Sequence, residues 1–236
     1  MSAYALLRQT ALPGLLALLA SWASVTPASA QPVSDQPFPV LETGMHTAPI
    51  MHFAVDRAGR YGASASGDKT ARVWNLADGS LLQTLRVPVG KDDEGKLYAV
   101  AISPDGERVA VGGWTGPKGS FNHSIYFFER ASGHLVGRIA GLPDHVKHLA
   151  WSPDGQRLAI ALGGKNGIRI HTTRPPYAEI ARDADYGDGS YSVDFDHSGR
   201  IVSSSWDGKL RLYDANLHLQ VPPRAVAGGS DPVFAR

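Results

Sequence analysis

Short runs in which apolar residues alternate with polar or small ones recur from residue 46 to about residue 220. The runs 51–55, 61–66 and 71–75 are typical examples. Alternation with a period of two is the pattern of a β-strand, because successive side chains of a strand point to opposite faces of a sheet. The chain is therefore expected to fold as a series of short strands.

Tight turns that end in glycine join the first and second strand of each unit. Four of them align, at residues 56–59, 103–106, 152–155 and 196–199, and their glycines lie 47, 49 and 44 residues apart. A period of about 45 residues with several short strands per unit is the signature of a β-propeller blade. The sequence thus predicts an all-β propeller of four-stranded antiparallel blades, with about four complete blades present. Their approximate bounds are 46–87, 97–141, 145–182 and 190–222.

The first unit carries the most specific motif of the chain. Its residues are, in order, Gly44-Met45-His46, Ser64, Ser66, Asp68 and Trp74-Asn75. The fourth unit has Asp207 in the equivalent turn and Tyr213 at the position of the tryptophan. With these residues the chain resembles the WD-repeat family from residue 37 to about residue 220. Units two and three lack the turn aspartate, and their Ser-Pro-Asp-Gly turns are equally typical of bacterial propellers of the TolB-like kind.

The resemblance implies a hydrogen-bonded tetrad of histidine, serine, aspartate and an aromatic residue that ties one blade together. In unit one its members are His46, Ser64 or Ser66, Asp68 and Trp74. In unit four, Asp207 and Tyr213 take the equivalent places. The resemblance also implies a platform whose loops, rather than its fold, decide what is bound.

Residues 1–30 predict a secretory signal peptide. Their single charge is Arg8, an apolar run follows at 11–20, and the segment ends in Ala28-Ser29-Ala30. This order of a basic start, a short apolar core and an Ala-x-Ala end is typical of a cleaved signal. The alternative, a membrane anchor, requires about 20 apolar residues, and Pro13-Gly14 interrupts this run. The mature chain is expected to start near Gln31, with a linker at 31–36 and the propeller at 37–236, in the bacterial periplasm or outside the cell.

Charge and cysteine content narrow the range of partners. Without Arg8 the chain has 22 basic and 22 acidic side chains. A formally neutral protein offers no net basic field for phosphates, which argues against nucleic acid as the partner. The absence of cysteine is compatible with export and removes every thiol-based mechanism.

The length predicts an incomplete ring. Residues 37–43 have the pattern of an outer strand without inner strands of its own, and residues 228–236 have that of the start of a fifth blade. The chain is therefore expected to be an open and apparently truncated propeller. A closed four-bladed ring and blades completed by a second subunit are the alternatives. An open propeller exposes strand edges and apolar faces, through which it can self-associate.

The repeats differ from one another mainly at one end of the blades. The longer connections are 87–96, 114–123 and 183–190, and all three are expected on the same rim. Elaborated loops on one rim of a repeat protein are typical of a binding face. Aromatic residues on or beside these connections are the candidate partner-binding residues: Trp114, Phe121, Tyr186, Tyr191 and Trp206. The alternative is that several of them pack between blades or fill the central channel.

No catalytic, cofactor or metal site is predicted. The acidic segment 183–189 has its glycine and third acidic residue out of register with a calcium loop. No two histidines have His-x-x-x-His spacing, and His145 and His148 are expected on opposite sides of a strand. The glycines at 163–167 lie between two strands, which favours a hairpin turn over a phosphate loop.

The predicted function is that of a non-enzymatic, exported interaction scaffold with an unidentified protein partner. The alternative is the non-catalytic propeller part of a larger enzyme, for example a peptidase-like one, whose catalytic segment is absent. This alternative follows from the resemblance, since some bacterial WD-repeat chains are joined to such domains. A third possibility is a propeller enzyme that uses a central metal.

Overall fold

The computed structural model describes residues 44–225, and these residues form strands, turns and irregular segments. The predicted signal peptide, the outer strand at 37–43 and the start of a fifth blade at 228–236 lie outside the described residues. The strands are, in chain order, β1 (Ile50–Val55), β2 (Tyr61–Ser66), β3 (Thr70–Asn75), β4 (Leu81–Arg86), β5 (Lys96–Ile102), β6 (Arg108–Trp114), β7 (His123–Glu129), β8 (Leu135–Leu142), β9 (Val146–Trp151), β10 (Arg157–Leu162), β11 (Ile168–Thr172), β12 (Glu179–Asp183), β13 (Ser190–Phe195), β14 (Ile201–Ser205), β15 (Lys209–Tyr213) and β16 (Arg224–Ala225).

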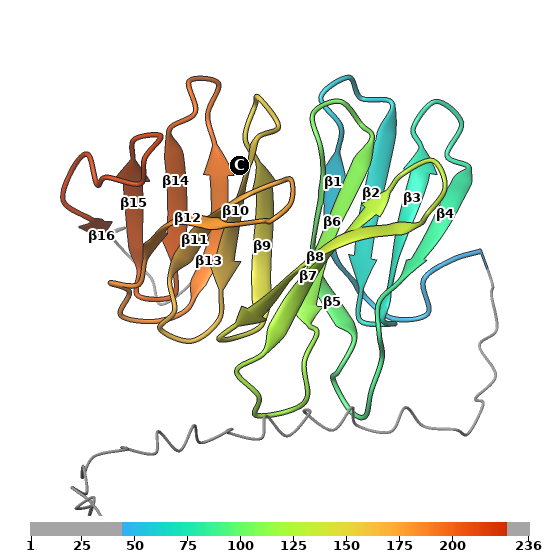
Figure 1. Ribbon diagram of the computed structural model, residues 1–236, viewed down its shortest axis with the longest axis horizontal. Coiled ribbons are helices and arrows are strands. Elements are labelled where there is room, and N and C mark those ends of the chain that lie inside the picture. The colour runs from blue at the N-terminus through green and yellow to red at the C-terminus, as the bar shows by residue number, and fades with distance from the viewer. Residues whose placement is uncertain (1–43, 226–236) are drawn as a thin grey trace, which may run out of the picture. The chain divides into compact units, whose positions relative to one another are not determined.

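Each repeat unit of the sequence forms one antiparallel sheet of four strands, paired in chain order (Figure 1). The turn glycines 59, 106, 155 and 199 explain the tight connections between first and second strands. All four have a positive φ, between 67° and 81°, a conformation that glycine adopts without the penalty that a Cβ brings. The predicted all-β propeller with about four blades is thereby confirmed. Within the described residues no helix occurs that is long and apolar enough to cross a bilayer.

The apolar core lies between successive sheets rather than inside any one of them. Three clusters of buried side chains fill the spaces between the first and second, second and third, and third and fourth sheets. Strands in the middle of the sheets, such as β2, β6 and β10, are buried on both faces for this reason, and small residues such as Ala63 and Ala159 are fully buried among larger ones. Burial of this apolar surface is the main force that holds neighbouring blades together.

The four sheets do not close into a ring within residues 44–225. The inner strands show this at one position of the repeat, six residues before each turn glycine. Phe53 of the first sheet is 47% exposed, whereas its counterparts Val100 and Val193 are fully buried. Met51 and Val55 beside Phe53 are exposed as well. This uncovered apolar face is the surface through which the predicted self-association would run, and that association stays a prediction.

Candidate functional site

The predicted tetrad of the first sheet is present and complete. Asp68 accepts a hydrogen bond from His46 Nδ1 at 2.8 Å, and His46 Nε2 lies 2.7 Å from Ser64 Oγ. Trp74 Nε1 donates to the same Ser64 oxygen at 2.9 Å. Of the two candidate serines, Ser64 is the member, because Ser66 Oγ instead donates to the Ala48 carbonyl. The tetrad joins the segment before β1 to β2, β3 and the turn between them.

Asp68 is the hub of this network. Its carboxylate also accepts hydrogen bonds from the amides of Thr47 and Thr70 and from the Thr70 hydroxyl. Burial by itself raises the pKa of Asp68, but the hydrogen bonds from Thr70 and His46 outweigh it and hold that pKa below the usual value. The ionised carboxylate is therefore the form that the fold stabilises.

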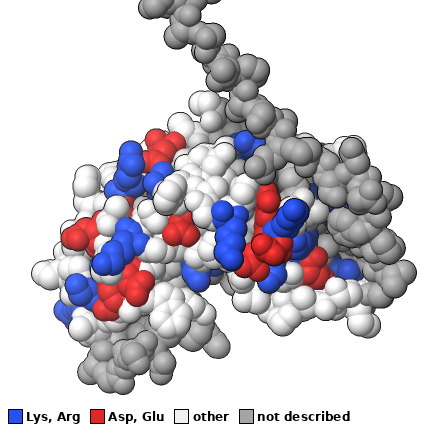
Figure 2. All heavy atoms as spheres, turned by 90° about the horizontal axis from the view of Figure 1, so that it is seen from below, with Lys and Arg blue, Asp and Glu red and all other residues white. Residues whose placement is uncertain are grey.

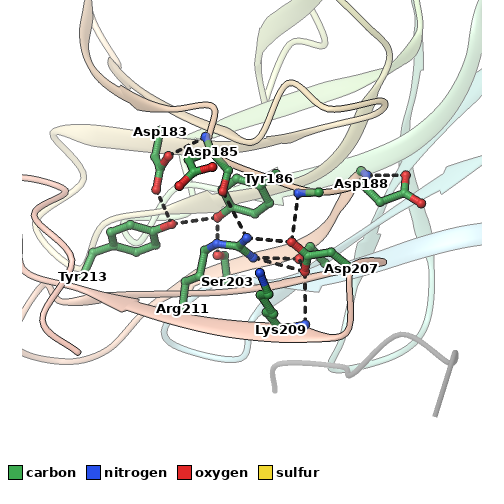
Figure 3. A network of polar contacts seen from close by, with 12 residues as sticks. Asp183, Asp185, Tyr186, Asp188, Ser203, Asp207, Lys209, Arg211 and Tyr213 are labelled. Atoms are coloured by element: carbon green, nitrogen blue, oxygen red, sulfur yellow. Dashed lines mark hydrogen bonds and ion pairs between the residues drawn. The ribbon is translucent and has the colours of Figure 1, made fainter. Parts of the chain in front are cut away.

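The fourth sheet holds a different network in the place of the tetrad (Figure 3). Tyr213, at the tryptophan position, donates to Asp183 Oδ2 at 2.8 Å. Its oxygen lies 3.0 Å from the hydroxyl of Tyr186, which also contacts Ser203 Oγ. Since Asp183 can only accept, the hydroxyls form a directed chain that runs from Ser203 through both tyrosines to the carboxylate. Burial raises the pKa of Tyr186 to about 12, so this chain stays protonated at neutral pH.

Tyr186 is therefore not a partner-binding residue, and the sequence interpretation is corrected at this position. Its side chain is 4% exposed and packs in the core between the third and fourth sheets. The residue lies 13 positions before the turn glycine Gly199, as His46 does before Gly59. Alignment from the turn glycines would have placed it in the tetrad, whereas its position on a long connection suggested a surface residue.

Asp207 does not join the hydroxyl chain but forms a buried ion pair with Arg211. Arg211 Nη2 donates to Asp207 Oδ2 at 2.6 Å, and both side chains are almost fully buried. The guanidinium also donates to the Asp185 carbonyl, and its carbon lies 3.8 Å from the centre of the Tyr186 ring. The ion pair thus links the β14–β15 turn to the connection before β13.

The other predicted partner-binding residues lie on the elaborated rim, at the lower end of the strands in Figure 1. Phe121, in the 115–122 loop between β6 and β7, is 82% exposed. Trp114 at the base of that loop is stacked on His145, with the rings 4.0 Å apart and 7° from parallel. Trp206 is 42% exposed and contacts Tyr191 edge to face. The rim thus presents exposed aromatic side chains on the second and fourth sheets.

Charged residues on this rim are of mixed sign. Figure 2 views the molecule from below, and on the part of this face that grey atoms leave visible the basic and acidic side chains are interspersed. A face without a single-sign field does not attract phosphates strongly. The exposed aromatic side chains, rather than charge, distinguish this rim.

A cavity of about 510 Å³ lies between the inner strands, and the sequence analysis did not predict it. Its walls come from β1, β5, β9 and β13 and from the turns that follow them. The titratable or charged residues among those lining it are His52, Arg57, His148, Asp194 and His197. His52 and His148 touch, with their Nε2 atoms 2.9 Å apart.

Three of these lining residues stand at aligned positions where the four repeat units carry different residues. Seven residues before the turn glycine, the four units have His52, Ala99, His148 and Ser192. Five residues before it, the first three units have alanine and the fourth has Asp194. Repeats that are otherwise alike therefore place two imidazoles and one carboxylate around one central cavity. Such changes at equivalent positions are the signal that could have indicated this site.

The WD40 family model, described as "WD domain, G-beta repeat", matches residues 39–75, 136–171 and 186–214. Coronin-7 of Rattus norvegicus is 26% identical over 217 residues, which cover 84% of this chain and 22% of the relative. Transducin beta-like protein 2 of Homo sapiens is 26% identical over 168 residues, which cover 69% of this chain and 37% of the relative. An uncharacterised WD repeat-containing protein of Synechocystis is 32% identical over 112 residues, which cover 48% of this chain and 28% of the relative. The chain thus spans well under half the length of these curated relatives.

Proposed function

We propose that this chain, which contains WD40 repeats and is similar to WD-repeat proteins, is a non-catalytic platform that binds a protein partner through the elaborated rim. WD-repeat proteins are in general interaction scaffolds. The observation that carries the proposal is the exposure of Phe121 in the 115–122 loop of this rim. Aromatic side chains are enriched in protein interfaces, and a few large side chains carry most of the binding energy. The turns between first and second strands on the opposite rim are short and contain no Phe, Tyr or Trp.

We expect Phe121→Ala and Trp206→Ala to weaken partner binding without loss of folding. Interface energy concentrates in a few large side chains, each worth about 2 kcal/mol or more on truncation, which corresponds to at least about 30-fold in affinity. The partner is first captured on the immobilised mature chain and identified by mass spectrometry. Its affinity for each variant is then measured by biolayer interferometry.

Ile180→Ala on the outer strand β12 is the matched control, because Ile180 is about as exposed as Trp206 but lies away from the rim. It is expected to bind normally. Trp114 is unsuitable as a first test, since its removal also breaks the stack on His145. Normal binding by both rim variants, together with loss in the Ile180 variant, would place the interface on the outer strands and overturn the proposal.

We also propose that the protein is exported, which the sequence of residues 1–30 supports. Expressed with its full N-terminus in a bacterium, the chain is expected in the periplasm or medium with Gln31 at or near its start. Intact-mass measurement of the fractionated product checks this. Recovery of the full-length chain in the membrane or cytoplasmic fraction would contradict it.

A further inference from the structure

Two histidines from different blades meet at the wall of the central cavity. His52 is on β1 and His148 is on β9, and the inner strand of the second sheet lies between them. That strand has Ala99 at the aligned position, so no side chain beyond a methyl group separates the imidazoles. Their Nε2 atoms are 2.9 Å apart and their ring centres 4.4 Å apart.

The other nitrogen of each ring, Nδ1, already makes a hydrogen bond to the backbone. His52 Nδ1 lies 3.1 Å from the carbonyl oxygen of Val100, and His148 Nδ1 lies 3.0 Å from that of Val193. A carbonyl oxygen can only accept, so both Nδ1 atoms must carry hydrogen and donate. In neutral rings both Nε2 atoms are then bare acceptors, and they lie only 2.9 Å apart.

The two neutral rings have too few hydrogens for their three contacts, so this arrangement needs a cation. Three contacts, two of N to O and one of N to N, each require one hydrogen, but two neutral imidazoles have only two. A proton between the Nε2 atoms would complete the set, and a metal ion bound by both Nε2 atoms would do the same without a third hydrogen. The two Nε2 atoms are therefore available to a Lewis acid.

We propose that His52 and His148 form a binding site for a divalent transition metal ion such as Zn²⁺. Imidazole nitrogen is a preferred ligand of zinc, copper and nickel. Histidines that bind metals almost always donate their other ring hydrogen to a carbonyl or carboxylate, as both rings do here. With Zn–N bonds of about 2.0–2.1 Å in tetrahedral geometry, two ligand nitrogens lie about 3.4 Å apart. The two Nε2 atoms need to separate by only about 0.5 Å.

The site has two protein ligands, and its other positions open toward the cavity. Among residues 44–225 no group of three or more histidine or acidic side chains converges as a closed metal site requires. Water from the cavity completes the coordination. Asp194 lines the same cavity, and its negative charge offsets part of the charge of the ion. Arg57 and His197 also line the cavity but are exposed on turns at its mouth, where solvent screens them.

The first test is a titration of zinc into the mature chain without a histidine tag, in which binding is measured by calorimetry. One equivalent is expected to bind. His52→Ala and His148→Ala are each expected to weaken binding at least tenfold, because a single imidazole remains. His197→Ala, which lines the same cavity, and His218→Ala, which is exposed, are the matched controls and are expected to bind as the unchanged protein does.

A second measurement does not depend on the variants being folded. In ¹⁵N spectra of the unchanged protein, zinc is expected to shift the Nε2 resonances of two histidines and to raise the melting temperature, and chelation is expected to reverse both effects. The proposal is overturned if no zinc binds below about 100 μM, or if His52→Ala or His148→Ala binds zinc as tightly as the two control variants. It is also overturned if the spectra show a proton held between the Nε2 atoms in the presence of zinc.

Discussion

Replacement of Asp207 by alanine is expected to destabilise the protein by about 3–5 kcal/mol, the usual cost of leaving one partner of a buried ion pair alone. Arg211 would retain its contacts with the Asp185 carbonyl and the Tyr186 ring, but its charge would be uncompensated. Urea unfolding followed by circular dichroism measures the loss. A cost below about 1 kcal/mol would show that the pair is screened by solvent, contrary to its burial.

The double variant Asp207→Leu with Arg211→Met separates the ion pair from packing. Removal of both charges leaves no uncompensated ion, so the double variant is expected to be more stable than Asp207→Ala alone. If the double variant is instead the less stable of the two, the side chains matter for their packing rather than for the pair.

The same ion pair makes stability depend on acid. Burial raises the pKa of Asp207, but the hydrogen bonds from Arg211 and Ser205 outweigh it, so that pKa lies well below its usual value. The stabilisation is therefore complete above the unfolded pKa of about 3.9, and it is lost progressively as the pH falls from that value through the much lower folded pKa. In Asp207→Ala this part of the acid dependence should be missing from melting curves recorded between pH 3 and pH 7.

Asp68→Ala is expected to cost about 1–3 kcal/mol through the partners that it leaves unpaired. His46 loses its acceptor, and two backbone amides and the Thr70 hydroxyl lose theirs. The loss should be greatest in the first sheet, so hydrogen exchange is expected to accelerate in β2 and β3 before the other sheets. Asp78→Ala, at an exposed turn of the same sheet, is the control and is expected to leave the melting temperature nearly unchanged. Equal melting temperatures for both variants would contradict a stabilising tetrad.

The sequence predicted those features that depend on local spacing. The turn glycines and the alternation of side chains determine the strands of each sheet, because both act within a few residues. The tetrad of the first sheet was also predictable, since its residues have the spacing of a recurrent motif. The choice between Ser64 and Ser66 was not, because residues two apart on a strand share a face and only the position of the His46 ring distinguishes them.

The sequence alone was least informative about contacts between units. His52 and His148 are 96 residues apart, and no local pattern relates them. Tyr186 illustrates the opposite error: it lies on a connection, yet the fold buries it where the first unit has a histidine. In both cases comparison of aligned positions is the informative step, because a repeat makes each unit a reference for the others.

Each repeat unit of the described residues forms one separate sheet and contains one tryptophan, so each blade has one tryptophan. Trp74, Trp114, Trp151 and Trp206 belong to the first, second, third and fourth sheets in turn. Their surroundings differ: the indole of Trp74 is hydrogen-bonded, whereas Trp206 is partly exposed. Repeat proteins can lose their units one after another rather than together. Variants that keep a single tryptophan therefore give each blade its own fluorescence signal, and the order in which the blades open can be recorded without any added label.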